Sequence, residues 1–169
     1  MATSGKVLEQ NKNIEEDISL LLLPYIINIP PVRRKGAWKP SRAEFRDGFV
    51  MNAPTDAEVQ PILAERRNKL LNLGVTFQPV VIYCGDAVGT ITKTYVVYED
   101  VLYEFRSLTK AADVAFKLFH ATGAQYPQES YDVWLLVQIA LYDLHTQFDH
   151  QSASLKQILV DLDFKNKIK

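Results

Sequence analysis

The 169-residue sequence has one cysteine, Cys84, and only seven glycines and eight prolines. A single thiol cannot form a disulfide within the chain, so nothing indicates a disulfide-stabilised fold or an oxidising compartment. Glycine and proline are too scarce for a collagen-like or low-complexity chain. The sequence therefore predicts a fold held together by a hydrophobic core. Its length favours a single domain over residues 1–169, with residues 1–13 expected to be flexible.

Long hydrophobic runs are also missing. The longest apolar segment, residues 18–29, has 12 residues and contains Pro24, whereas a membrane-spanning helix needs about 20. The acidic residues Glu15, Glu16 and Asp17 precede it, where a secretory signal would be basic. These absences predict an intracellular protein, in the cytoplasm or the nucleus, that does not associate with membranes.

Catalytic and cofactor motifs are absent as well. His145 and His150 are five residues apart, whereas zinc ligands on one helix are three or four apart, and His120 lies far away in the chain. The glycines of segment 85–89 lack the GK[ST] of a phosphate loop and precede a β-prone run. Cys84 has no His or Asp partner that the sequence assigns, and a lone cysteine is most often a small buried hydrophobe. We therefore predict no catalytic residue, no metal, no cofactor and no enzymatic activity.

Charge is balanced overall but concentrated locally. Nineteen Lys and Arg against twenty Asp and Glu give a net charge of −1, which argues against binding nucleic acid by bulk charge. The proline-bounded connection over residues 30–46 is nevertheless basic, since its only acid is Glu44. The candidate partner-binding or nucleic-acid-binding residues are Arg33, Arg34, Lys35, Trp38, Lys39, Arg42 and Arg46.

This basic segment has three interpretations. Arginine side chains suit phosphate oxygens, and an exposed Trp38 would stack on a base, which favours nucleic acid. The same cations would also pair with an acidic partner protein. In the third interpretation they pair with acids of this chain, and Trp38 anchors the connection in the core.

Hydrophobic periodicity and turn residues predict the secondary structure. Strands are expected at residues 49–53, 77–84, 93–98 and 101–105, and helices at 14–23, 42–46, 55–73 and 107–122, from Pro127, and from a Ser154 cap to 164. Pro24 is expected to end the first helix, with a strand or an extended arm after it, and Gly48 to end the second. The expected class is α+β: a small mixed sheet of about four strands packed against C-terminal helices, with an N-terminal helical arm.

The N-terminal arm is rich in leucine. Its apolar stripe packs either on the domain's own core or on another chain. The candidate self-association residues are Ile18, Leu21, Leu22, Tyr25 and Ile27. With no catalytic motif present, we predict a non-catalytic protein–protein interaction or assembly module that forms homo-oligomers through this arm. The alternative is a nucleic-acid-binding protein that uses the basic segment.

Overall fold

A computed structural model describes the backbone of residues 2–28, 38–85 and 90–167, and the side chains of 14–28, 38–85 and 90–162. Backbone contacts divide the chain into two compact units. The sheet unit comprises residues 1–22 and 50–125, and the helical unit comprises residues 23–49 and 126–169. The predicted α+β class is confirmed, whereas the single domain stays a prediction.

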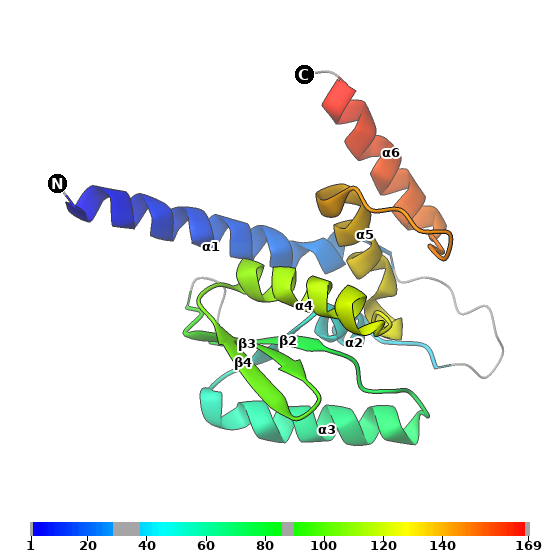
Figure 1. Cartoon of the computed structure of the whole chain (residues 1–169), viewed down its shortest axis with the longest axis horizontal. Coiled ribbons are helices and arrows are strands. Elements are labelled where there is room, and N and C mark those ends of the chain that lie inside the picture. The colour runs from blue at the N-terminus through cyan, green and yellow to red at the C-terminus, as the bar shows by residue number, and fades with distance from the viewer. Residues whose placement is uncertain (1, 29–37, 86–89, 168–169) are drawn as a thin grey trace. The chain divides into compact units, whose positions relative to one another are not determined.

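Over the described residues the chain forms six α-helices, two short 3₁₀ helices and four strands (Figure 1). In chain order they are α1 (Ala2–Ile26), α2 (Arg42–Phe49), β1 (Val50–Ala53), η1 (Asp56–Glu58), α3 (Val59–Asn72), β2 (Val80–Cys84), β3 (Lys93–Tyr98), β4 (Val101–Phe105), α4 (Leu108–Thr122), η2 (Gln128–Ser130), α5 (Tyr131–Tyr142) and α6 (Ala153–Lys167).

The sheet unit is built on a four-stranded mixed sheet in the order β1-β2-β3-β4. β1 and β2 are parallel and α3 connects them, so this part of the chain is a βαβ crossover. β3 and β4 continue the sheet as an antiparallel hairpin, with Tyr98 paired to Val101 across a two-residue turn. β4 therefore lies at one edge of the sheet.

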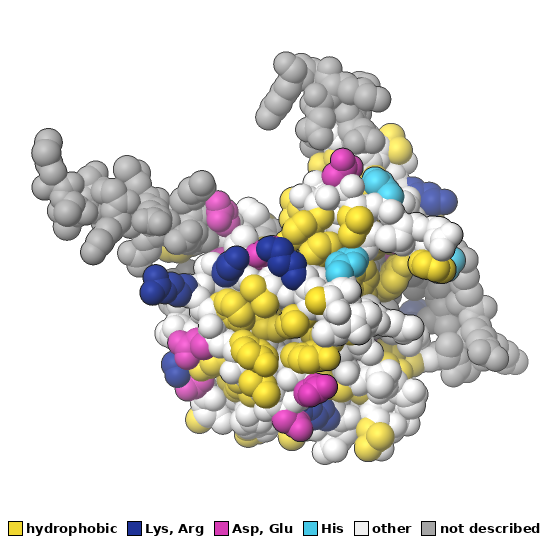
Figure 2. All heavy atoms as spheres, in the orientation of Figure 1, with side chains coloured by type: hydrophobic (Ala, Val, Ile, Leu, Met, Phe, Trp, Pro, Cys, Tyr) yellow, Lys and Arg dark blue, Asp and Glu magenta, His cyan; other side chains and the backbone are white. Residues whose placement is uncertain are grey.

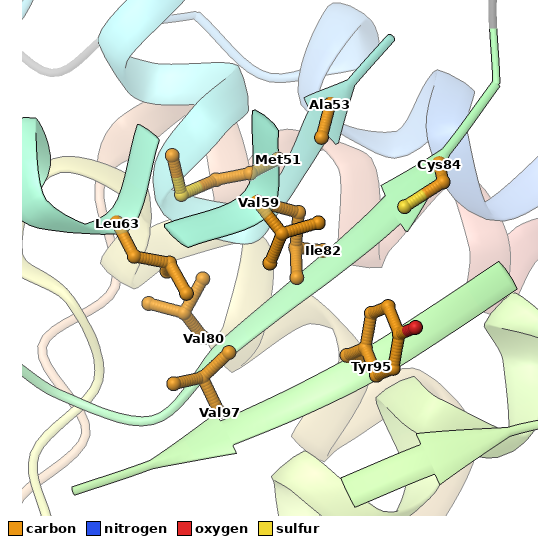
Figure 3. Packing of buried hydrophobic residues seen from close by; sticks show 9 residues of the cluster. All are labelled: Met51, Ala53, Val59, Leu63, Val80, Ile82, Cys84, Tyr95 and Val97. Atoms are coloured by element: carbon orange, nitrogen blue, oxygen red, sulfur yellow. The ribbon is translucent and has the colours of Figure 1, made fainter. Parts of the chain in front are cut away.

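Both faces of the central strands are buried. On one face, residues of the sheet pack with Val59 and Leu63 of α3 in a cluster that Figure 3 shows from close by. On the other face α4 packs against β2, β3 and β4, and it buries alanines such as Ala111 and Ala115. Figure 1 shows α3 and α4 on opposite sides of the sheet. Burial on both sides explains the continuous apolar sequence of β2.

The helical unit has α5 at its centre. Trp134 is completely buried and makes an edge-to-face contact with Phe49 of α2, with 4.8 Å between ring centroids. Residues 132–139 of α5 are all buried, as its nearly uniform apolar sequence predicts. Asp132 is buried too, and hydrogen bonds from Ser152 tie it to the start of α6; burial raises the pKa of its carboxyl group.

The structure corrects several predicted boundaries. α1 begins at Ala2 and continues two residues beyond Pro24 to Ile26, where a strand or an extended arm is predicted. Proline removes only one backbone donor, and the Arg42 guanidinium donates to the carbonyl oxygens of Pro24 and Ile27 at 3.0 and 2.9 Å, which satisfies acceptors at the helix end.

Gly48 and Ser154 also differ from the predictions. Gly48 lies inside α2. A Cβ at that position would stand 2.4 Å from the Glu129 side chain, so the lack of a side chain permits the close packing of α2 on η2. The α6 cap is Ser152, whose hydroxyl accepts from the Leu155 amide at 3.2 Å. The Ser154 hydroxyl instead accepts from the backbone amide of Asn28.

Candidate interaction surface

The structure describes four of the seven candidate residues of the basic segment. Arg33, Arg34 and Lys35 lie outside the described residues, whereas Trp38 is half-buried and Lys39 is exposed. Arg42 binds the end of α1, and its guanidinium also lies 5.6 Å from the centre of the Phe45 ring.

Arg46 pairs with Asp47 at 2.8 Å and also interacts with Tyr25. Two of the candidate partner-binding or nucleic-acid-binding residues thus make contacts within the helical unit itself. The role of the basic segment in binding stays a prediction.

The candidate residues of the N-terminal arm differ in exposure. Ile27 is completely buried, Ile18 and Leu21 are half-buried, and Leu22 and Tyr25 are 54% and 55% exposed. Ile27 therefore contributes to packing, whereas Leu22 and Tyr25 are accessible. Self-association through the arm stays a prediction.

Cys84 is buried, whereas the three histidines are exposed. Cys84 is completely buried in the cluster between sheet and α3, and burial raises the pKa of its thiol, which disfavours the reactive thiolate. His120, His145 and His150 are all exposed. Among the described side chains, no group of three or more His, Cys, Asp or Glu is placed to hold a metal ion.

A polar cluster lies where β1 ends and β3 begins. The Asp56 carboxylate accepts hydrogen bonds from the Lys93 amino group and the Tyr95 hydroxyl, each at 2.6 Å. The bond from Lys93 is the main reason that the pKa of Asp56 is lowered, and the bond to Asp56 likewise raises the pKa of Lys93. These contacts fasten η1 to the sheet.

Next to this cluster is a hollow of about 460 Å³, lined by residues 91–94 and 104–106. Its lining includes Lys93, Glu104 and Arg106. Asp56 neutralises Lys93, and Glu104 offsets the charge of Arg106, so these four groups give the hollow no net charge that would attract an ionic ligand.

The outer edge of β4 has the features of a binding surface. Among the described residues no strand pairs with that edge, because β4 bonds only to β3. Tyr103 is paired with Val96, so its side chain lies on the α4 face of the sheet, together with those of Val101 and Phe105. Val101 is 48% exposed and Tyr103 47% exposed. Figure 2 shows hydrophobic side chains gathered over the β3–β4 hairpin.

Arg67 of α3 contacts the turn of the β3–β4 hairpin. Its guanidinium donates to the Glu99 carbonyl oxygen, pairs with Asp100 at 3.2 Å and lies 4.7 Å from the centre of the Phe77 ring. Glu99 has a φ of 53°, a left-handed conformation that is costly for a residue with a side chain. The contacts of Arg67 therefore hold the hairpin that contains β4 against α3.

The helical unit carries exposed apolar side chains of its own. Leu141 is 68% and Phe148 73% exposed, at the end of α5 and in the loop that follows. Buried Gln138 holds this loop in place, because its amide donates to the Leu144 carbonyl and to both carboxylate oxygens of Asp149, at 3.0–3.1 Å. These hydrogen bonds therefore fix the loop that contains Phe148.

Sequence reasoning correctly places a strand at 101–105 but does not identify β4 as a surface. The available signal is weak, because Val101, Tyr103 and Phe105 stand at alternate positions but only Glu104 between them is polar. This pattern does not tell an edge strand from a central one. Only the order of strands in the sheet shows that one edge of this strand is unpaired over the residues that the structure describes.

Comparisons with known proteins do not identify a function for this surface. No protein-family model, curated protein or solved structure matches this chain. Within the described part of the chain, no helix combines the length and the apolar character required to cross a bilayer.

Proposed function

We propose that this chain is a non-catalytic protein–protein interaction module that binds an extended strand of a protein along β4. The observation that supports it is the outer edge of β4, which pairs with no strand among the described residues and carries exposed Val101 and Tyr103. A strand added to such an edge gains main-chain hydrogen bonds, and the alternating side chains provide specificity.

The alternation of hydrogen bonds identifies the backbone groups available to a partner. Tyr98 and Val101 close a two-residue turn, so they form a hydrogen-bonded pair and Val101 directs its N–H and C=O toward β3. Tyr103 and Phe105, two and four residues further on, likewise direct their N–H and C=O groups toward β3. The backbone groups of Leu102 and Glu104 therefore point away from the sheet, toward the free edge.

This edge has little of the protection that soluble sheets usually carry. Edge strands are commonly blunted by proline, a bulge, inward-pointing charges or a covering helix. β4 contains no proline, and its five residues pair with β3 in continuous register, without a bulge. Glu104 is the one charged residue within it. An exposed aromatic face beside open backbone groups favours binding of a strand.

The test uses a displayed library of nine-residue peptides, selected on the full chain. We expect enrichment of sequences that alternate apolar and polar residues. The matched control is Glu104→Pro, which removes an outward N–H while leaving the β3 ladder intact, because proline is tolerated at the solvent side of an edge strand. Peptides that bind the wild type but not this variant support the proposal. Equal selection by both, or no enrichment, refutes it.

The alternative, nucleic-acid binding by the basic segment, has a separate test. Binding of mixed DNA and RNA probes at low salt is expected to fall steeply as salt is raised, and to disappear when Arg33, Arg34 and Lys35 are replaced by Ala. These three residues are preferable to Arg42, whose loss would disturb the end of α1. Absence of any probe shift at low salt would rule out this alternative.

A further inference from the structure

We propose that the strand added to β4 is β4 of a second copy of this chain, antiparallel and centred on Tyr103. The proposal rests on the proposed function and names the partner at the same edge. The two sheets would then join into one continuous sheet across a two-fold axis, and each copy would offer the same surface to the other.

Hydrogen-bond parity limits the possible registers. The outward backbone groups belong to Leu102 and Glu104, and an antiparallel neighbour must place its own outward groups opposite them. Centring on Tyr103 pairs Leu102 of each copy with Glu104 of the other, and both pairs are hydrogen-bonded. Tyr103 then faces its own counterpart as a non-hydrogen-bonded pair, where side chains approach most closely.

Charge selects among the registers that parity allows. In the register centred on Tyr103, Asp100 lies opposite Arg106 of the second copy, and this pair occurs twice. Both side chains are exposed, Asp100 by 94%. A shift of one step to centre on Leu102 would put Asp100 opposite Glu104 of the second copy. A shift the other way would put Glu104 opposite its own counterpart. Like charges directly opposite each other destabilise a pair of strands.

The side chains on the α4 face agree with this register. Val101 lies opposite Phe105 of the second copy on each side of the central Tyr103 pair. Aromatic pairs and pairs of an aromatic with a β-branched residue are among the favourable cross-strand combinations. The exposed apolar surface of each hairpin thus covers that of the other. A second copy therefore matches the β4 edge in backbone, charge and apolar surface.

The main experiment is sedimentation equilibrium of the full chain over a concentration series. We expect a reversible monomer–dimer equilibrium, weak because one five-residue strand forms the contact. Glu104→Pro is expected to abolish the dimer. Leu22→Asp, on the N-terminal arm, serves as the control and is expected to leave it unchanged. A dimer that survives Glu104→Pro and is lost with Leu22→Asp would overturn the proposal in favour of the arm.

Charge exchange tests the register itself. Asp100→Arg alone and Arg106→Asp alone each place like charges opposite each other, and each is expected to raise the dimer dissociation constant about ten-fold or more. The double exchange is again self-complementary and is expected to restore dimerisation. An equimolar mixture of the two single variants is expected to form heterodimers, because each supplies the charges that the other lacks.

Two outcomes separate this proposal from the proposed function. A chain that stays monomeric at every concentration, but selects peptides through β4, refutes the second copy as partner and supports strand binding. Failure of both experiments refutes both. Asp100 also pairs with Arg67, so a general loss of folding would affect the double exchange as well. Restoration of the dimer by the double exchange excludes that explanation.

Discussion

Gly48→Ala tests the packing of the helical unit. A Cβ at position 48 would stand 2.4 Å from Cγ of Glu129 and 2.9 Å from Oγ of Ser130. Both neighbours are buried, with exposures of 2% and 0%, so neither can move aside into solvent. The new methyl group must therefore push α2 and η2 apart or force side chains out of their preferred rotamers.

Two opposing effects determine the magnitude. In a helix, alanine is favoured over glycine by about 0.5–1 kcal/mol. Overpacking of a well-filled site typically costs about 1–3 kcal/mol. Because the overlap is severe and the neighbours are buried, we expect the second effect to dominate, with a net loss of stability of about 1–2 kcal/mol. At a loss of about 2 kcal/mol of stability per molar urea, the middle of the usual range, the unfolding midpoint should fall by roughly 0.5–1 M.

The assay is urea unfolding followed by the fluorescence of Trp134, which is completely buried in the same unit. A Trp38→Phe background removes the signal of the other tryptophan. Ala43→Gly, on the exposed side of α2, is the matched control and reports helix propensity alone. An unchanged or raised midpoint for Gly48→Ala would refute the packing argument, since propensity would then be the dominant effect.

Three further predictions concern stability. Glu99→Gly is expected to stabilise the chain by about 0.5–1 kcal/mol in thermal unfolding, because glycine relieves the left-handed conformation of the hairpin turn; a lower melting temperature would contradict this. The pKa of Asp56 is lowered in the folded state by Lys93, so its stabilising effect is present above the unfolded value of about 3.9 and is lost as the pH falls through the folded value. Stability measured against pH should therefore decline less in acid for Asp56→Asn than for the wild type, and identical profiles would exclude the effect. Arg42→Gln should lower stability by about 1.5–3 kcal/mol in urea unfolding, because two carbonyl oxygens at the end of α1 lose a charged donor; Lys39→Gln is the matched control, and equal effects of the two would argue against the contact.

Much of the local structure is predictable because its signals are themselves local. Ser107 accepts a hydrogen bond from the Lys110 amide at the start of α4, and Gly123 ends that helix with a φ of 68°. Both follow from capping preferences that act within one turn of chain. The β3–β4 hairpin follows in the same way from two β-prone runs separated by two residues.

Where prediction fails, the deciding contact comes from a distant part of the chain. Pro24 is tolerated within α1, and Arg42 of another helix binds the carbonyl oxygens at its end. Gly48 lies within a helix, at a point where only a residue without a side chain leaves space for Glu129. Neither fact is visible in the neighbouring residues.

The candidate surface shows the same division. The order of residue types in 101–105 and the charges of Asp100 and Arg106 are properties of the sequence alone. Whether those residues face solvent depends on strand order, and β4 lies at an edge because β2 and β3 occupy the centre of the sheet.

The sequence by itself determined the α+β class, most of the helices and strands, and the absence of recognisable catalytic motifs, because these depend on composition and short-range pattern. Tertiary structure decided which polar groups bond to other groups of the chain and which apolar side chains remain exposed. Burial is a property of packing between distant segments, so the intramolecular contacts of Arg42 and Arg46 and the exposure of Tyr103 follow only from the fold.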